Sequence, residues 1–77
     1  MIHYQQHITS DHRVMLGKPV IKGTRITVEL VVRKLAQGAT PEDITKMYPH
    51  IMREDVSAVL LYAADVLANE EILDSVV

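Results

Sequence analysis

One stretch decides the fold of this 77-residue chain: Gly17-Lys18-Pro19-Val20-Ile21-Lys22-Gly23-Thr24-Arg25-Ile26-Thr27-Val28. Its two glycines permit backbone angles that other residues avoid, and its proline fixes φ at about −65°. Three cations stand among alternating apolar residues, directly before a helical pattern. The stretch therefore predicts a tightly shaped turn-and-strand unit with a largely basic surface, which suits an anionic or acidic partner.

A small β element is expected over residues 8–26, around this stretch. Residues 8–10 predict a short strand, and a hairpin is expected with its strands at Val14-Met15-Leu16 and Val20-Ile21. Because Pro19 has no N–H to donate, its strand belongs at a sheet edge or a bulge. Residues 1–7 lack periodicity and are expected to form an arm.

Three helices are expected over residues 27–69. Thr27 is a typical N-cap for the first helix, whose apolar residues recur at helical spacing until Gly38 ends it in a left-handed conformation. A short second helix is expected to begin at Thr40-Pro41, since a hydroxyl cap followed by proline is typical of a helix start. A longer third helix is expected from about Arg53 to Asn69.

The fold class predicted is mainly α, a three-helix, helix-turn-helix domain with a short N-terminal β element. The length allows one domain over 1–77, divided into the arm 1–7, the β element 8–26, the bundle 27–69 and a tail 70–77 whose role the sequence leaves open. Without cysteine, Phe or Trp, the core must be aliphatic. No stretch approaches the roughly 20 apolar residues of a membrane span, so a cytoplasmic protein without a membrane partner is expected.

The third helix carries an apolar arc wider than two short helices can cover. One stripe consists of Val56, Leu60, Ala63 and Leu67, widened by Leu61, Ala64 and Ala68 on one side and by Val59 and Val66 on the other. This leaves facing outward Glu54, Asp55, Ala58, Tyr62, Asp65 and Asn69. We expect a homodimer with Val59, Leu61 and Val66 at its interface. The alternative is that the N-terminal strands cover the arc within one chain.

Charge is distributed unevenly along the chain, although its net value is only −2. Residues 1–38 hold six cations and two acids, a net charge of +4, whereas residues 39–77 hold two cations and eight acids, a net charge of −6. Such polarity favours oriented association, either between copies or with a charged partner. The alternative is that two solvated faces simply differ in charge.

The sequence argues against an enzyme and against a bound cofactor or metal. Without cysteine there is no thiol nucleophile, and the paired acids at helix starts are explained by the helix dipole. His3 and His7 have a spacing of four residues but lie in the arm, where no helix is expected to align them for a metal. We therefore expect no catalytic residue, no metal site and no cofactor.

Two kinds of macromolecular partner remain open. In helix-turn-helix proteins the last helix enters the DNA major groove, but here its first turns carry Glu54 and Asp55, which repel phosphates. The cations of the first half of the chain are better placed to neutralise phosphates. A protein partner carrying acids is the second possibility, with Arg25 foremost because a guanidinium can grip a carboxylate with two hydrogen bonds. Alternatively, Arg25 pairs internally with Glu29 or an acid of the third helix.

Several short motifs together resemble one known family, the bacterial domain-of-unknown-function family numbered 433. The likeness spans about residues 8–68 and is carried by Gly17-Lys18-Pro19-Val20-Ile21-Lys22-Gly23-Thr24-Arg25-Ile26, Val28, Leu35-Ala36-Gln37-Gly38, Pro41-Glu42-Asp43-Ile44, Tyr48-Pro49, Glu54-Asp55-Val56 and Leu60-Leu61-Tyr62-Ala63. This chain departs from the family pattern twice. Thr27 replaces a frequent proline, and Met52 stands where Ser or Thr would cap the third helix, which predicts a start weaker by about 1 kcal/mol.

The resemblance implies a homeodomain-like domain and a function by association with neighbouring genes. Such proteins are often encoded beside a PIN-like ribonuclease and are grouped as antitoxins of the VapB type. It therefore implies an antitoxin that binds and inhibits a PIN-like ribonuclease toxin, with promoter DNA as a second partner. The residues expected to bind the toxin are Lys18, Lys22 and Arg25, and those expected to contact DNA are Arg33, Lys34 and Arg53. The alternatives are a stand-alone DNA-binding regulator and a structural dimerisation module.

Overall fold

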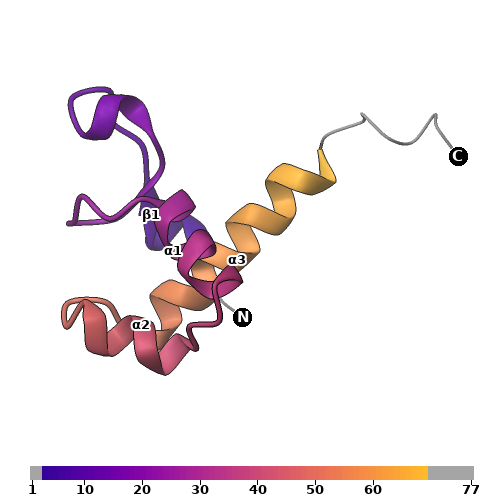
Figure 1. Cartoon of the computed structure of the whole chain (residues 1–77). Coiled ribbons are helices and arrows are strands. Elements are labelled where there is room, and N and C mark those ends of the chain that lie inside the picture. Colours follow the sequence, from indigo (N-terminus) through magenta and orange to yellow (C-terminus); the bar gives the residue numbers. More distant parts are fainter. Residues whose placement is uncertain (1–2, 70–77) are drawn as a thin grey trace, which may run out of the picture.

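Three helices and a short two-stranded antiparallel sheet form this protein, as a computed structural model of residues 3–69 shows (Figure 1). In chain order the elements are η1 (Tyr4–Gln6), β1 (Ile8–Thr9), η2 (Met15–Gly17), β2 (Val20–Ile21), α1 (Val28–Ala36), α2 (Pro41–Met47) and α3 (Arg53–Ala68). The predicted fold class is confirmed. The expected tail 70–77 and the first two residues of the expected arm lie outside the described residues.

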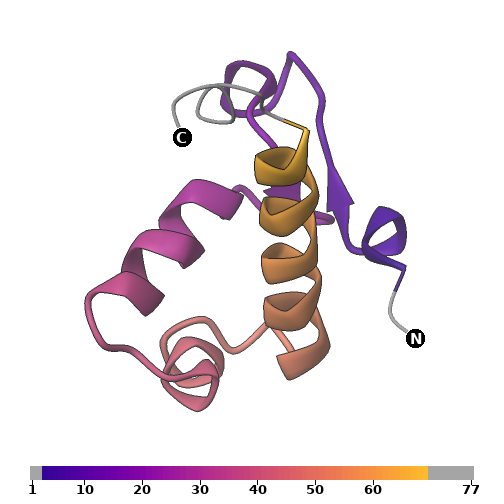
Figure 2. The ribbon, with the colours of Figure 1, turned by 90° about the vertical axis from the view of Figure 1, so that its right-hand side faces the viewer.

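The longest helix, α3, lies at the centre of the molecule. Figure 2 shows α1 and α2 on one side of α3 and the N-terminal segment on the other. One cluster of buried aliphatic side chains joins the sheet to all three helices; its members are Ile8, Ile21, Val28, Val31, Ile44, Ile51, Val56, Ala58 and Val59. The core is therefore aliphatic, as the composition requires.

The predicted starts of α1 and α2 and the end of α1 are confirmed. The Thr27 hydroxyl accepts the N–H of Leu30 at 3.0 Å, which caps α1. Gly38 follows α1 with a φ of 105°, the left-handed conformation that ends many helices. At the start of α2, the Thr40 hydroxyl accepts the N–H of Asp43 at 3.1 Å, and the Asp43 carboxylate accepts the N–H of Thr40 at 2.9 Å. The two bonds form a capping box.

The predicted hairpin is wrong, although the predicted short strand exists. β1 pairs with β2, with Ile8 opposite Ile21, whereas residues 14–16 form no strand. The reason is local, because Met15, Leu16 and Gly17 have successive φ values of 50°, 57° and 84°, which turn the chain left-handed instead of extending it. The chain leaves β1 through this turn and returns as β2, so that both isoleucines reach the core.

The orientation predicted for α3 is also wrong. Ala58, expected to face outward, is fully buried, and Tyr62 packs against the core. Val59, expected at a dimer interface, is fully buried inside its own chain and cannot contact a partner. The reason is that residues 4–9 do not form a free arm. They form η1 and β1, which cover this face of α3, and Tyr4 meets Tyr62 edge to face with ring centroids 5.4 Å apart.

Asp55 holds the covered face of α3 to the N-terminal segment. One of its carboxylate oxygens accepts a hydrogen bond from Nδ1 of His7 at 2.8 Å, and the other accepts the N–H of Met52 at 2.9 Å. The second bond satisfies a free N–H at the helix start, so α3 is capped from within although Met52 lacks a capping hydroxyl. The side chain of Met52 makes no capping bond, as predicted, so Asp55 supplies only the half of the cap that binds the Met52 N–H.

Hydropathy gives no sign of a membrane span in the described part of the chain. Within residues 3–69, none of the helices combines the length and the apolar content needed to cross a bilayer.

Candidate functional site

The candidate site is the basic loop, defined as residues 22–25 between β2 and α1. Its ends are closed by a hydrogen bond from the N–H of Ile21 to the carbonyl of Ile26 at 2.9 Å. Inside the loop, the Thr24 hydroxyl donates to the Ile21 carbonyl at 2.7 Å and accepts the N–H of Ile26 at 3.0 Å. Gly23 has a φ of 81°, which closes the turn at no steric cost. The loop is therefore held by its backbone and by one hydroxyl.

A further backbone bond ties the basic loop to the N-terminal segment. The N–H of Lys22 donates to the carbonyl of His7 at 2.7 Å. The side chains of Lys22 and Arg25, by contrast, are exposed. The loop thus presents two cations on a backbone that is fixed at both ends and at its first residue.

Lys22 and Arg25 are two of the four Lys and Arg side chains that form no ion pair within residues 3–69; the other two are Lys34 and Lys46. Among residues 3–69, ion pairs join Arg13 to Asp11, Lys18 and Arg33 to Glu29, and Arg53 to Glu42. No carboxylate within this range pairs with Lys22 or Arg25, and Glu29, the internal partner considered for Arg25, is occupied by Lys18 and Arg33. The hydrogen bond from Arg33, followed by the charge of Lys18, holds the pKa of Glu29 below its ordinary value.

Two clefts flank the basic loop. One, of about 500 Å³, lies between the loop and the connection from α2 to α3, and the side chains facing the loop there are Met47, Tyr48, Pro49 and His50. The other, of about 440 Å³, lies on the side of the sheet and is lined by Thr9, Asp11, Val14 and Val20 together with Gly23, Thr24 and Arg25. Arg25 borders both clefts. A carboxylate entering the first cleft would meet Lys22, Arg25 and the ring of His50.

The remaining cations expected at binding sites lie elsewhere. Lys18 is not grouped with Lys22 and Arg25, because its ammonium lies 3.5 Å from Glu29. Arg33 shares Glu29 at 2.7 Å, and Arg53, at the start of α3, pairs with Glu42 of α2. Lys34, in the last turn of α1, has no ion pair in the described part of the chain. The structure therefore brings together two of the three residues expected to bind a partner. Of the three expected to contact DNA, Arg33 and Lys34 are neighbours in the last turn of α1, whereas Arg53 begins α3 and pairs with Glu42.

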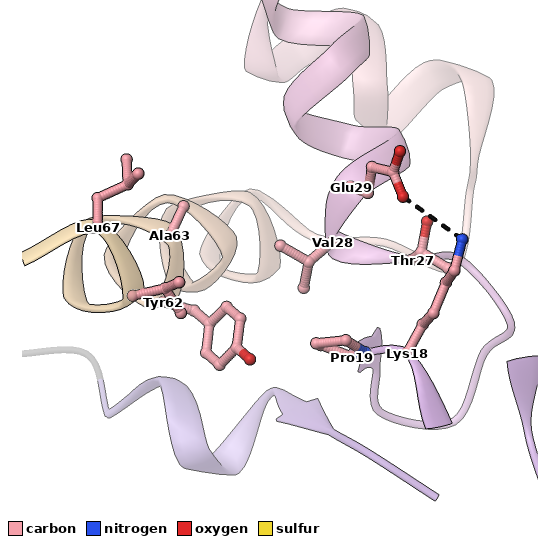
Figure 3. Close-up of a pocket in the computed structure, with 9 residues that line it drawn as sticks. Lys18, Pro19, Thr27, Val28, Glu29, Tyr62, Ala63 and Leu67 are labelled. Atoms are coloured by element: carbon pink, nitrogen blue, oxygen red, sulfur yellow. Dashed lines mark ion pairs between the residues drawn. The ribbon is translucent and has the colours of Figure 1, made fainter. Parts of the chain in front are cut away.

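A second feature, the apolar groove, lies on another side of the molecule. It has a volume of about 420 Å³ and runs between the last turns of α3 and the segment that enters α1 (Figure 3). Its walls are Tyr62, Ala63, Val66 and Leu67 of α3, facing Lys18, Pro19, Thr27, Val28 and Glu29. The Lys18–Glu29 ion pair stands at its rim. Of the three residues expected at a dimer interface, Leu61 and Val66 are exposed on α3.

The sequence did not indicate Tyr48 and His50 as neighbours of the basic loop. They follow α2, more than twenty residues away from the loop along the chain, and only the packing of the α2–α3 connection brings them there. No spacing in the sequence signals such a contact. Within residues 3–69, no three His, Asp or Glu side chains gather closely enough to hold a metal ion.

Comparisons with known proteins agree with this architecture. The family model for "Protein of unknown function (DUF433)" matches residues 8–63. This chain therefore belongs to the DUF433 family, and the resemblance stated from its motifs is confirmed.

A solved structure and a search of curated proteins complete the comparison. The crystal structure of a DUF433 member protein from Anabaena variabilis is similar to this chain, with 33% identity and a TM-score of 0.75. The match covers 79% of this chain and 60% of that one, so this chain spans less than two thirds of its neighbour's length. No curated protein matches.

Proposed function

We propose that this protein is an antitoxin that binds and inhibits a PIN-like ribonuclease, with the basic loop as its contact. The observation that carries the proposal is the pair Lys22 and Arg25, two exposed cations without acidic partners in residues 3–69, on a loop closed by its own hydrogen bonds. The nature of the toxin comes from the family resemblance. Metal-dependent nucleases of this kind cluster carboxylates in their active sites.

The loop is suited to such a partner because of its fixed backbone. A protein pays an entropic cost for every segment that becomes ordered on binding, and a loop already closed avoids most of it. A guanidinium can hold a carboxylate by two parallel hydrogen bonds, and an ammonium adds a point charge beside it. Placed among the acids of a nuclease, Arg25 and Lys22 would occupy the position that a catalytic metal ion needs.

DNA is a less well supported partner. Arg33 and Arg53 already pair with carboxylates, and Glu54 is exposed in the first turn of α3, where a reading helix would approach phosphates. Promoter binding by a complex with the toxin stays a secondary proposal, in which Lys34 is the unpaired cation available.

The test is charge reversal at the loop. Arg25→Glu should abolish co-purification with the PIN-like ribonuclease that the proposal gives this protein as its partner, and should restore the activity of that ribonuclease on RNA. The double variant Lys22→Glu/Arg25→Glu should do the same. Both side chains are exposed, so circular dichroism and the thermal midpoint should match those of the wild type.

Lys34→Glu is the matched control, because it makes the same change in charge on α1, away from both clefts of the basic loop. It should leave toxin binding unchanged. An Arg25→Glu variant that still binds and inhibits the ribonuclease contradicts the site. Wild-type protein that ignores the ribonuclease but binds its own upstream DNA, with a steep dependence on salt that Lys34→Glu reduces, supports the regulator instead.

A further inference from the structure

The cleft between the basic loop and the α2–α3 connection has walls from two distant parts of the chain. One wall is the basic loop, and the other is formed by residues 47–50. In Figure 1 both segments project to the left of the molecule, the basic loop above the connection. The bonds that close the basic loop join residues 21–26 to one another, so they fix its shape but not its distance from the opposite wall. That distance is set by contacts outside the loop.

His7 connects the basic loop to α3. Its carbonyl accepts the N–H of Lys22 at 2.7 Å, and its Nδ1 donates to a carboxylate oxygen of Asp55 at 2.8 Å. An ionised carboxylate can only accept, so Nδ1 carries the proton in this bond. The side chain of His7 is 23% exposed and that of Asp55 is 14% exposed, so the bond is largely shielded from water. One residue thus holds the loop by its carbonyl and the helix by its ring.

Asp55 connects the same helix to the opposite wall of the cleft. Its second carboxylate oxygen accepts the N–H of Met52, the last residue of the α2–α3 connection, at 2.9 Å. Within the connection, the N–H of the buried Ile51 donates to the carbonyl of Tyr48 at 2.8 Å. The two oxygens of one carboxylate therefore reach both walls, although Asp55 itself does not line the cleft.

We propose that Asp55 and His7 are positioning residues for the binding site, which together set the separation of the two walls of this cleft. For the identity of the bound partner, the inference rests on the proposed function. A sheet of two strands, each of two residues, is too small to hold the basic loop in place by itself. A guanidinium that grips a carboxylate by two parallel hydrogen bonds needs a fixed position. The placement of Lys22 and Arg25 then depends on a carboxylate outside the cleft.

Amide hydrogen exchange of the free protein, followed by NMR, tests this link without any partner. His7→Leu replaces the ring by an apolar side chain of similar size, and the Lys22 amide should then exchange about tenfold faster relative to the Val59 amide. Val59 is fully buried in the core, so its exchange reports opening of the whole fold, and the ratio removes any general loss of stability.

His7→Asn is the matched control. Its side-chain nitrogen stands as many bonds from the backbone as Nδ1 does and can donate to Asp55, so the ratio of Lys22 to Val59 exchange should stay at the wild-type value.

A second variant acts from the helix. Asp55→Ala removes both links, so the amides of Lys22 and Met52 should both exchange faster relative to that of Val59. Glu54→Ala removes the neighbouring exposed acid and should change neither amide.

Affinity for the PIN-like ribonuclease tests the consequence for binding. At a temperature where every variant is folded, His7→Leu should weaken binding about tenfold, and His7→Asn should bind like the wild type. Equal losses in these two variants would mean that the ring of His7 contacts the partner directly, and would overturn the positioning role. Unchanged affinity in His7→Leu would overturn it as well.

The exchange result separates this inference from the proposed function. A Lys22 amide whose exchange relative to Val59 is unchanged in both His7→Leu and Asp55→Ala overturns the inference, even if the wild type binds the ribonuclease. A wild type that does not bind the ribonuclease contradicts the proposed function instead, and the exchange ratio still decides whether Asp55 and His7 hold the loop in place.

Discussion

Leu16 is the residue whose conformation fits its chemistry least. It combines a φ of 57° and a ψ of 32° with a side chain that is 92% exposed. For a residue other than glycine, this left-handed conformation costs about 1–2 kcal/mol, and the exposed side chain returns no burial energy. The turn redirects the chain from β1 to β2. The Leu16 side chain makes no buried contact that would stabilise this turn.

Leu16→Asn should therefore raise the free energy of unfolding by about 0.5–1 kcal/mol, since asparagine tolerates the left-handed conformation better than leucine. Urea denaturation followed by circular dichroism measures the change. A matched substitution, Leu60→Asn, relieves no such strain because Leu60 lies within α3, and it should not raise the free energy of unfolding. An unchanged or lowered stability of Leu16→Asn would mean that the turn is not strained in solution.

The exposure of Arg25 and Lys22 could be predicted from the sequence alone. Their charge and the glycine between them indicated a tightly shaped turn with a basic surface, and both side chains are exposed on such a turn. Lys18 lies in the same motif but turns to Glu29 of α1. Its pairing depends on where α1 begins in space, which a linear pattern does not contain.

At the scale of elements, the start of α3 depends on Asp55. This carboxylate caps the helix through Met52 and holds His7 at the same time. Asp55→Ala should lower the free energy of unfolding by about 2 kcal/mol, because it removes a cap and a partly buried hydrogen bond to a charged group. Chemical denaturation at neutral pH measures the loss.

Glu54→Ala is the control for this prediction, since Glu54 is the neighbouring acid in the same helical turn but is exposed and forms no ion pair within residues 3–69. It should change stability by less than about 0.5 kcal/mol. Equal losses in the two variants would show that only the helix dipole matters at this position. Hydrogen exchange in residues 4–9 should increase in Asp55→Ala alone.

The elements that the sequence predicted well are those with local signals. Thr27, Gly38 and the Thr40 capping box act on backbone groups within four residues of themselves. A local sequence pattern is therefore sufficient to predict them. The orientation of α3 has no local cause. Its apolar arc is wide enough to be buried in several orientations. The observed orientation is fixed by contacts of Tyr4 with Tyr62 and of His7 with Asp55, which are more than forty residues apart in the chain.

At the scale of the whole molecule, acid should destabilise the fold. Hydrogen bonds with Thr40 hold the pKa of Asp43 below its ordinary value, and the Arg13 side chain does the same for the pKa of Asp11. A carboxylate whose pKa is lower in the folded state stabilises the fold above its unfolded value of about 4, and this contribution is lost as the pH falls through the folded value. The urea midpoint should therefore fall between about pH 5 and pH 2.

Asp43→Asn identifies the contribution of the capping box to this loss. Asparagine can still accept the N–H of Thr40 but does not titrate, so the variant should be less stable than the wild type at neutral pH and approach it in acid. A difference between the two proteins that stays constant from pH 7 to pH 2 would contradict the assignment.

The closure of the basic loop has a consequence for the divergence of related copies. Because the turn is fastened by backbone groups and the Thr24 hydroxyl, the side chains of Lys22 and Arg25 contribute nothing to its shape. Substitutions at these two positions should therefore leave the conformation of the loop unchanged. Under the proposed function, two such proteins could therefore recognise different partners while differing only at these two positions.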